Sequence, residues 1–210
     1  MTVAEFLERL ASAEPVPGGG SASAMSASVA ASLVAMVARL SLDRPKYEPY
    51  RATNERGLAT ADSARARLLE LADEDARAYG KFSAARKMPK ETAEEQAARE
   101  EATSEAARVA SDVPLLVVRA CAELLEQIDE MAGRSNLNAS SDLEVAARLS
   151  AAAAHGAAAN VRINLPSVGD DRYAGAARVE LNHLLRDVDR TLARVTQHVG
   201  RGDLRAPERG

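Results

Sequence analysis

The sequence predicts an all-α fold, a single-domain bundle of about six to seven helices with Ala/Ser-rich helices at its centre. Of the 210 residues, 46% are apolar but only 3% are aromatic and none is Trp, so Ala, Leu, Val and Met must build the core. Apolar residues recur at helical spacing, and Pro and Gly clusters separate the periodic segments. A chain of this length forms one domain with a sizeable core. We expect a helical domain over 1–200 and a frayed tail over 201–210.

The first two helices follow from local signals. Thr2 and Glu5 fit a capping box, which predicts a helix over about 3–12 that ends before two prolines. The next helix is expected to begin near Gly20 or Ser21 and to reach about Leu40. It is apolar on nearly every face, so it belongs at the centre of a bundle or in a subunit interface.

Periodicity predicts the later helices over about 50–82, 91–110, 114–132, 141–165 and 171–199. Pro114 lies inside an otherwise helical pattern. It therefore either starts a new helix in its first turn or kinks a longer one.

Composition and charge exclude several classes of protein. A net charge of −4 and a pI near 5.5 argue against a nucleic-acid partner. The uncharged segment 21–38 contains five Ser and seven Ala, too few large apolar residues for a membrane span, so we expect a helix buried in protein. No targeting signal is visible and the single cysteine, Cys121, has apolar neighbours, which favours a buried thiol in a cytoplasmic protein. The three histidines lack metal-ligand spacing, and no metal site is expected.

Three consecutive glycines, Gly18, Gly19 and Gly20, stand in the stretch PVPGGGSASA and are followed by Ser21. No Gly-Lys-Ser/Thr sequence follows them, which excludes a phosphate loop. The two prolines argue against a free linker. Local features leave two alternatives open, a hinge and part of a site.

Two further groups of polar residues are candidates for chemistry. Lys46 and Tyr47 lie between two prolines, so a stiff backbone would hold them; the alternative is an ordinary exposed Lys and a packing Tyr. Asp75, Tyr79 and Phe82 share a helix face, which places a carboxylate beside two aromatic rings. A solvated acid is the alternative there.

A polar cluster precedes the second Ala-rich helix and comprises Asn136, Asn138, Ser141 and Asp142. A cap and a turn would explain it fully. Asn160 and Asn164 lie one turn apart in a small, apolar helix. Burying both amides is costly unless they bond to each other, to a ligand or to a partner chain.

Together these segments resemble one family over almost the whole chain, the cyclodeaminase/cyclohydrolase family of folate enzymes. The matching pieces, in family order, are PVPGGGSASA, the Lys46-Tyr47 loop, DEDARAY, MPKETAEEQAAR, ASDVPLLV, NLNASSDLEVAA and GAAANVRINLPSV. The resemblance implies a helical homodimer that acts on a tetrahydrofolate derivative without a tightly bound cofactor. Two reactions are open: closure of 5-formiminotetrahydrofolate to the 5,10-methenyl compound with loss of ammonia, or hydrolysis of the methenyl compound to 10-formyltetrahydrofolate.

The resemblance also suggests roles for these residues. Lys46, half-buried in its loop, is the first candidate for moving a proton, with Tyr47 orienting it. Asp75 and Asp142 are expected near the pterin and the cationic N5–C–N10 bridge. The amides of Asn136, Asn138, Asn160 and Asn164 and the Ser141 hydroxyl are expected to bind substrate. Backbone N–H groups of Gly18 to Ser21 are expected to meet a carboxylate of the glutamate tail.

A non-catalytic helical dimer that binds a folate or a partner protein is the alternative. Retention of Lys46, Asp75 and Asp142 together favours the enzyme, because a scaffold needs none of them. The two reactions share substrate shape and a tetrahedral intermediate, so the sequence does not choose between them.

Overall fold

The computed structural model describes residues 1–207 and contains, within them, six α-helices and no strand. The α-helices are α1 (Val3–Leu10), α2 (Gly19–Leu42), α3 (Arg51–Arg86), α4 (Ala93–Met131), α5 (Ser140–Asn164) and α6 (Asp171–Arg201). Short 3₁₀ turns join them: η1 (Pro45–Tyr50), η2 (Leu137–Ala139) and η3 (Leu165–Ser167). The predicted all-α fold is confirmed.

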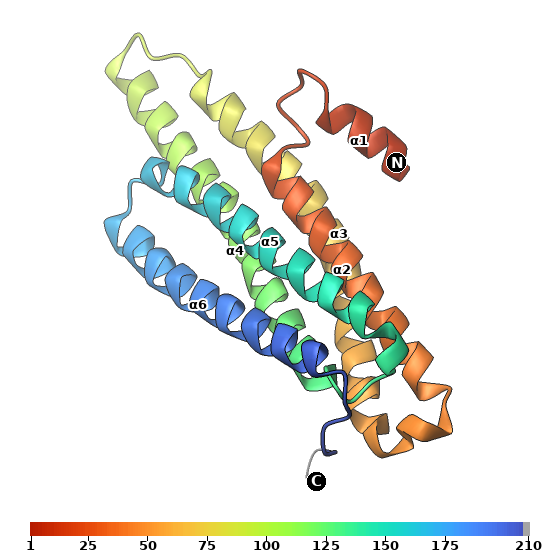
Figure 1. Ribbon diagram of the computed structural model, residues 1–210. Helices are drawn as coiled ribbons and strands as arrows, with labels where there is room; N and C mark the ends of the chain where they lie inside the picture. Colours follow the sequence, from red (N-terminus) through yellow and green to blue (C-terminus); the bar gives the residue numbers. More distant parts are fainter. Residues whose placement is uncertain (208–210) are drawn as a thin grey trace.

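Helices α2 to α5 form a four-helix bundle in which successive helices run in opposite directions (Figure 1). The ring closes because α5 packs back against α2, and α6 lies along α4 and α5. Helix α1 lies beside the bundle near the start of α2 and buries only Phe6. Its expected capping box is present, since the Thr2 hydroxyl accepts the Glu5 N–H and the Glu5 carboxylate accepts the Thr2 N–H.

Small side chains let α2 and α5 approach each other closely. A Cβ on Gly156 of α5 would lie 2.5 Å from the Ser23 hydroxyl of α2. The buried serines of α2 find acceptors in their own helix or in α3. Ser23 donates to the Gly19 carbonyl and Ser41 to the Val37 carbonyl, whereas Ser28 donates to the Arg65 carbonyl of α3. The Ala/Ser composition thus gives a dense centre without orphaned hydroxyls.

Helix α2 is long and apolar enough to cross a membrane by length and hydropathy alone. Half of its most apolar window is buried inside the bundle, where α2 packs between α3 and α5. That placement is typical of a core helix.

Pro114 does not begin a new helix, and the expectation of a helix ending near 110 is wrong. Helix α4 runs unbroken from Ala93 to Met131 with Pro114 inside it. A proline has no N–H, so the carbonyl four residues earlier, that of Ala110, loses its helical partner. The Asn164 side chain donates to this carbonyl at 2.7 Å. A residue of α5 therefore compensates for the proline of α4.

The C-terminal tail contacts the bundle at residues 205 and 206, and the frayed tail expected over 201–210 stays a prediction. The Arg205 N–H donates to the Gly133 carbonyl at 2.7 Å, and the Tyr50 hydroxyl donates to the Arg205 carbonyl at 2.8 Å. The Arg134 guanidinium donates to the Ala206 carbonyl. Residues 208–210 lie outside the described residues.

Candidate active site

A pocket of about 390 Å³ lies where α2 begins, between α2, α3 and α5. Its lining comprises Pro15, Val16, Gly18, Gly19, Gly20, Asp75, Tyr79, Phe82, Arg86, Ala110, Asn160, Ile163, Asn164 and Ser167. The structure thus brings together the three glycines, Asp75 and both asparagines of α5, which lie far apart in the sequence.

Gly20 is the residue that permits close approach. A Cβ at Gly20 would lie 2.1 Å from Asp75 Oδ1 and 2.5 Å from its Cγ, far inside van der Waals contact. A Cβ at Gly19 would lie 3.5 Å from Asn160 Nδ2, an ordinary contact. The carboxyl group of α3 therefore rests directly against the first turn of α2 at Gly20.

Asp75 is half-buried and accepts hydrogen bonds from Ser21. The Ser21 hydroxyl lies 3.0 Å from Asp75 Oδ2 and 2.9 Å from the Ala72 carbonyl, so its single proton serves one acceptor at a time. Burial raises the pKa of the Asp75 carboxyl, while the hydrogen bonds from Ser21 oppose that rise. Among residues 1–207, no cation pairs with it.

Asn160 and Asn164 use their amide N–H groups inside the chain. Asn160 Nδ2 donates to the Gly156 carbonyl at 2.9 Å, and Asn164 Nδ2 donates to Ala110 as described. Both side chains line the pocket. Their carbonyl oxygens have no donor among the described residues, so these oxygens can accept from a ligand.

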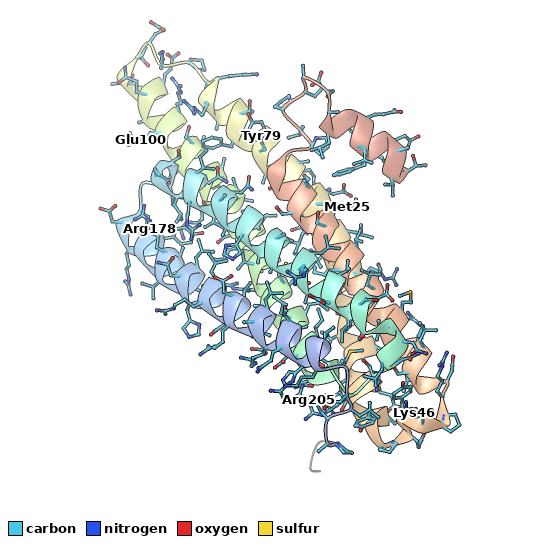
Figure 2. The ribbon with its side chains drawn as sticks, viewed as in Figure 1. Met25, Lys46, Tyr79, Glu100, Arg178 and Arg205 are labelled. Atoms are coloured by element: carbon cyan, nitrogen blue, oxygen red, sulfur yellow. The ribbon has the colours of Figure 1, made fainter. Side chains whose placement is uncertain are left out.

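Lys46 and Tyr47 lie at the opposite end of the bundle, on η1 (Figure 2). Lys46 is exposed, so the half-burial expected for it is absent in the single chain. Tyr47 is buried; its hydroxyl accepts the Leu137 N–H at 3.1 Å and lies 3.4 Å from Asn136 Oδ1. Its ring lies 5.5 Å below the Lys46 ammonium.

Asn136 is buried, and its polar atoms bond within the chain. Its N–H donates to the Ser41 hydroxyl, its Nδ2 lies 3.4 Å from the Leu40 carbonyl, and its Oδ1 accepts the Asn138 N–H. Its polar atoms are therefore engaged locally. Asn138 and Ser141 are exposed and Asp142 is half-buried nearby, at the start of α5.

The sequence candidates therefore form two groups and not one. Helix α2 separates them, since the glycines open it and Lys46 follows its end, and its 24 residues span roughly 36 Å. The end of the bundle that holds Asp75 and the pocket is called the glycine end. The opposite end, which holds Lys46, Asn138, Ser141 and Asp142, is called the lysine end.

Comparison with known proteins decides the family. The family model for formiminotransferase-cyclodeaminase matches residues 2–183. The chain belongs to this family.

Relatives within the formiminotransferase-cyclodeaminase family carry both names. A methenyltetrahydrofolate cyclohydrolase of Methylorubrum extorquens is 35% identical over 198 residues, which cover 94% of this chain and 95% of that protein. A formimidoyltransferase-cyclodeaminase of Sus scrofa is 36% identical over 182 residues, 87% of this chain and 34% of that protein. The chain thus spans about a third of the length of the animal relative.

A solved family structure shares the whole fold. The crystal structure of formiminotetrahydrofolate cyclodeaminase from Thermotoga maritima superposes with a TM-score of 0.86 at 27% identity and covers 95% of this chain and 96% of that one.

The sequence analysis did not predict that Arg86 lines the pocket. Arg86 continues the helix face of Asp75, Tyr79 and Phe82 by one more turn, so the spacing contained the signal. Its guanidinium lies 5.8 Å from the Phe82 ring centre. Ile163 and Ser167 were also missed, because nothing local marks them as pocket residues.

No group of three or more His, Cys, Asp or Glu side chains converges as a metal site within residues 1–207. The histidines have other partners: His155 contacts Asp189 at 2.7 Å, and His183 contacts Asp187 at 3.0 Å.

Proposed function

We propose that this protein is a one-carbon enzyme that acts at the N5–C–N10 bridge of a tetrahydrofolate, either as a methenyltetrahydrofolate cyclohydrolase or as a formiminotetrahydrofolate cyclodeaminase. One observation carries the proposal: a half-buried carboxyl without a cationic partner in its chain lies beside Tyr79 and Phe82 in a pocket. Family membership supports it, and the relatives of both names support catalysis over the non-catalytic alternative.

The substrate supplies the cation that Asp75 lacks. The N5–C–N10 unit of the methenyl compound is an amidinium, whose positive charge an adjacent carboxylate stabilises. Tyr79 and Phe82 offer aromatic faces on which the pterin or the aminobenzoyl ring can stack. The free Oδ1 atoms of Asn160 and Asn164 can accept N–H groups of the pterin.

In the hydrolytic direction, Asp75 acts as the general base. It removes a proton from water as the water oxygen bonds to the methenyl carbon, which gives a tetrahedral carbon between N5 and N10. The C–N5 bond then breaks as the proton passes from Asp75 to N5. The hydroxyl on the carbon gives up its remaining proton to solvent as the formyl C=O bond forms, and 10-formyltetrahydrofolate is released. A carboxyl whose pKa is raised by burial is better matched to these transfers than an ordinary aspartate.

In the cyclodeaminase reaction, the same carboxyl protonates the leaving group. N10 bonds to the formimino carbon and loses its proton, and the C–NH₂ bond breaks as Asp75 protonates the departing ammonia. Both reactions therefore need one proton carrier at the same carbon. Asp75 replaces Lys46 as our first candidate, because Asp75 lies in the pocket and Lys46 lies at the other end of its chain.

The glutamate tail of the folate is proposed to lie toward Arg86. A second hollow of about 680 Å³ shares Arg86 and Ser167 with the pocket and adds Lys90 and Arg99. We expect Arg86→Ala to raise KM about tenfold with little change in kcat, since a charged hydrogen bond far from the reacting carbon is lost.

Steady-state kinetics of Arg86→Ala check this prediction, and Arg186→Ala on the exposed side of α6 is the control. An unchanged KM in Arg86→Ala, or an equal rise in the control, would contradict this position for the tail.

The test of the function is an absorbance assay that offers both substrates in parallel. The purified protein should make the methenyl band appear from 5-formiminotetrahydrofolate, or make it decay faster than buffer alone. The direction of the larger effect identifies the reaction. If neither substrate changes faster than its blank, the protein is not this enzyme.

We also propose that the protein works as a homodimer, which the resemblance implies and which an exposed apolar face on α2 and α5 supports. A cytoplasmic location and the absence of a tightly bound cofactor stay predictions.

A further inference from the structure

The Ser21 side chain contacts Asp75 from inside the protein. Ser21 is only 1% exposed and does not belong to the lining of the pocket. From the first turn of α2, its hydroxyl reaches two acceptors of α3, Asp75 Oδ2 at 3.0 Å and the Ala72 carbonyl at 2.9 Å. The Ser21 N–H also donates to the Asp75 carboxyl. The Ser21 hydroxyl therefore acts on the chemistry of the pocket through Asp75.

The start of α2 holds the Asp75 carboxyl in place. The N-cap residue of α2 is Gly18, which has no side chain to accept the first N–H groups of the helix. The carboxyl of Asp75 on α3 accepts one of them, that of Ser21. Gly20 leaves room for this approach, since a Cβ there would lie 2.1 Å from Asp75 Oδ1. Gly20 and Ser21 together thus fix how the carboxyl is oriented.

The Ser21 hydroxyl has one proton and two acceptors within reach, so it has two possible positions. When Asp75 is ionised, donation to Oδ2 is a charge-assisted hydrogen bond and is the stronger of the two. When Asp75 is protonated, Oδ2 is a weaker acceptor, and the hydroxyl can turn to the Ala72 carbonyl. The buried hydroxyl is then paired in both states, so protonation of Asp75 leaves no donor without an acceptor.

Other buried serines of α2 lack this pair of acceptors. Ser28 also donates from α2 to a carbonyl of α3, that of Arg65, at 3.1 Å. Ser23 donates to the Gly19 carbonyl of its own helix. Within residues 1–207, neither hydroxyl donates to a carboxylate. Ser28 therefore offers a matched control, because it makes the same kind of contact between α2 and α3 without an acid.

We propose that Ser21 is a positioning residue for Asp75, whose hydroxyl donates to the carboxylate until Asp75 takes a proton and then turns to the Ala72 carbonyl. This inference rests on the proposed function. In the hydrolytic direction, the hydroxyl turns away as Asp75 takes the proton of water and returns as that proton passes to N5. Ser21 itself gains and loses no proton, so the proton balance of the reaction is unchanged.

Loss of the Ser21 hydroxyl should change how Asp75 titrates. Its donation favours the ionised carboxyl, so the pKa of Asp75 should rise in Ser21→Ala. The other groups that titrate or carry charge in the described pocket lining are Arg86 and Tyr79, both on α3, whereas the lining residues of α2 and α5 carry no charge. Ser21→Ala leaves Arg86 and Tyr79 in place, so the change reports the missing hydroxyl.

The pH dependence of turnover is the first test. In Ser21→Ala, kcat should fall about tenfold, the effect of one hydrogen bond to a charged group. The decrease of kcat/KM on the acidic side should begin at higher pH than in the wild type, because kcat/KM follows the ionisation of the free enzyme. Ser28→Ala should keep the wild-type profile. A wild-type profile in Ser21→Ala, or the same change in Ser28→Ala, would overturn the inference.

Carbon-13 NMR titration tests the same contact without turnover. The Asp75 carboxyl resonance is assigned by its loss in Asp75→Asn, and the Ser21 Cβ resonance by its loss in Ser21→Ala. We expect the Asp75 midpoint to lie at higher pH in Ser21→Ala than in wild type or Ser28→Ala. The Ser21 Cβ resonance should follow the Asp75 midpoint in wild type and should not titrate in Asp75→Asn.

The two measurements distinguish failure of the inference from failure of the proposed function. A wild type that converts neither folate, with an Asp75 midpoint that moves in Ser21→Ala, would refute the proposed function and leave Ser21 as the residue that positions Asp75. An active wild type whose Asp75 midpoint is the same in Ser21→Ala would overturn the role of Ser21 alone. A Ser21 Cβ resonance that does not change with pH would also overturn it.

Discussion

Asp75→Asn is expected to lower kcat by about 10²- to 10⁴-fold, the usual contribution of a general acid or base. The amide keeps the shape of the carboxyl but neither accepts a proton nor neutralises the amidinium. The kcat/KM of the wild type should fall at acidic pH as Asp75, whose pKa is raised by burial, becomes protonated. The residual activity of the variant should not show this decrease. A variant with wild-type kcat would remove Asp75 from the mechanism.

The same substitution is expected to stabilise the fold at neutral pH. Burial raises the pKa of Asp75 in the folded state above its unfolded value. The folding stability that this group contributes is complete below about pH 3.9, the ordinary pKa of an aspartate, and is lost as pH rises through the folded pKa. Because Asn does not ionise, urea denaturation at pH 7 should show Asp75→Asn to be more stable than wild type. If Asp75→Asn is less stable than wild type at pH 7, burial of the ionised Asp75 carboxylate does not destabilise the fold.

Gly20→Ala is expected to cost about 10²-fold in kcat, the loss that a misplacement near 1 Å can cause. The added methyl would lie 2.1 Å from Asp75 Oδ1, so either the carboxyl or the first turn of α2 must move. The matched control is Gly19→Ala, whose methyl would lie 3.5 Å from Asn160 Nδ2 and should leave kcat within a factor of about three.

Kinetics and thermal denaturation of both glycine variants distinguish an effect on the position of Asp75 from a loss of folding stability. Alanine favours a helix more than glycine does, so neither variant should lose its helical signal. If Gly19→Ala and Gly20→Ala behave alike, close approach at Gly20 does not position Asp75.

Local signals predicted those elements that short-range physics determines. The capping box of Thr2 and Glu5 and the apolar centre of α2 were confirmed, because each depends on residues within a few turns. Pro114 was ambiguous for a physical reason. A proline inside a helix is tolerated only where its orphaned carbonyl finds another donor, and that donor, Asn164, lies 50 residues farther along the chain.

The candidate site shows the same division. The spacing of Asp75, Tyr79 and Phe82 correctly predicted one face, and a longer search along it would have reached Arg86. The half-burial expected for Lys46 was wrong, because η1 lies at the end of the bundle and leaves the Lys46 side chain exposed. A ligand role for Asn136 stays a prediction; within the chain its N–H donates to the Ser41 hydroxyl of α2 and its Oδ1 lies 3.4 Å from the Tyr47 hydroxyl.

Hydrogen–deuterium exchange with and without 5-formyltetrahydrofolate, a stable folate, tests most directly whether the folate occupies the Asp75 pocket. The first N–H groups of α2 have no helical partner and should exchange quickly in the free protein. We predict slower exchange on ligand addition in peptides over 15–22, 75–86 and 159–167, which contain the lining of the pocket. Saturating ligand that slows exchange in none of these segments, or only elsewhere on the bundle, would contradict the account.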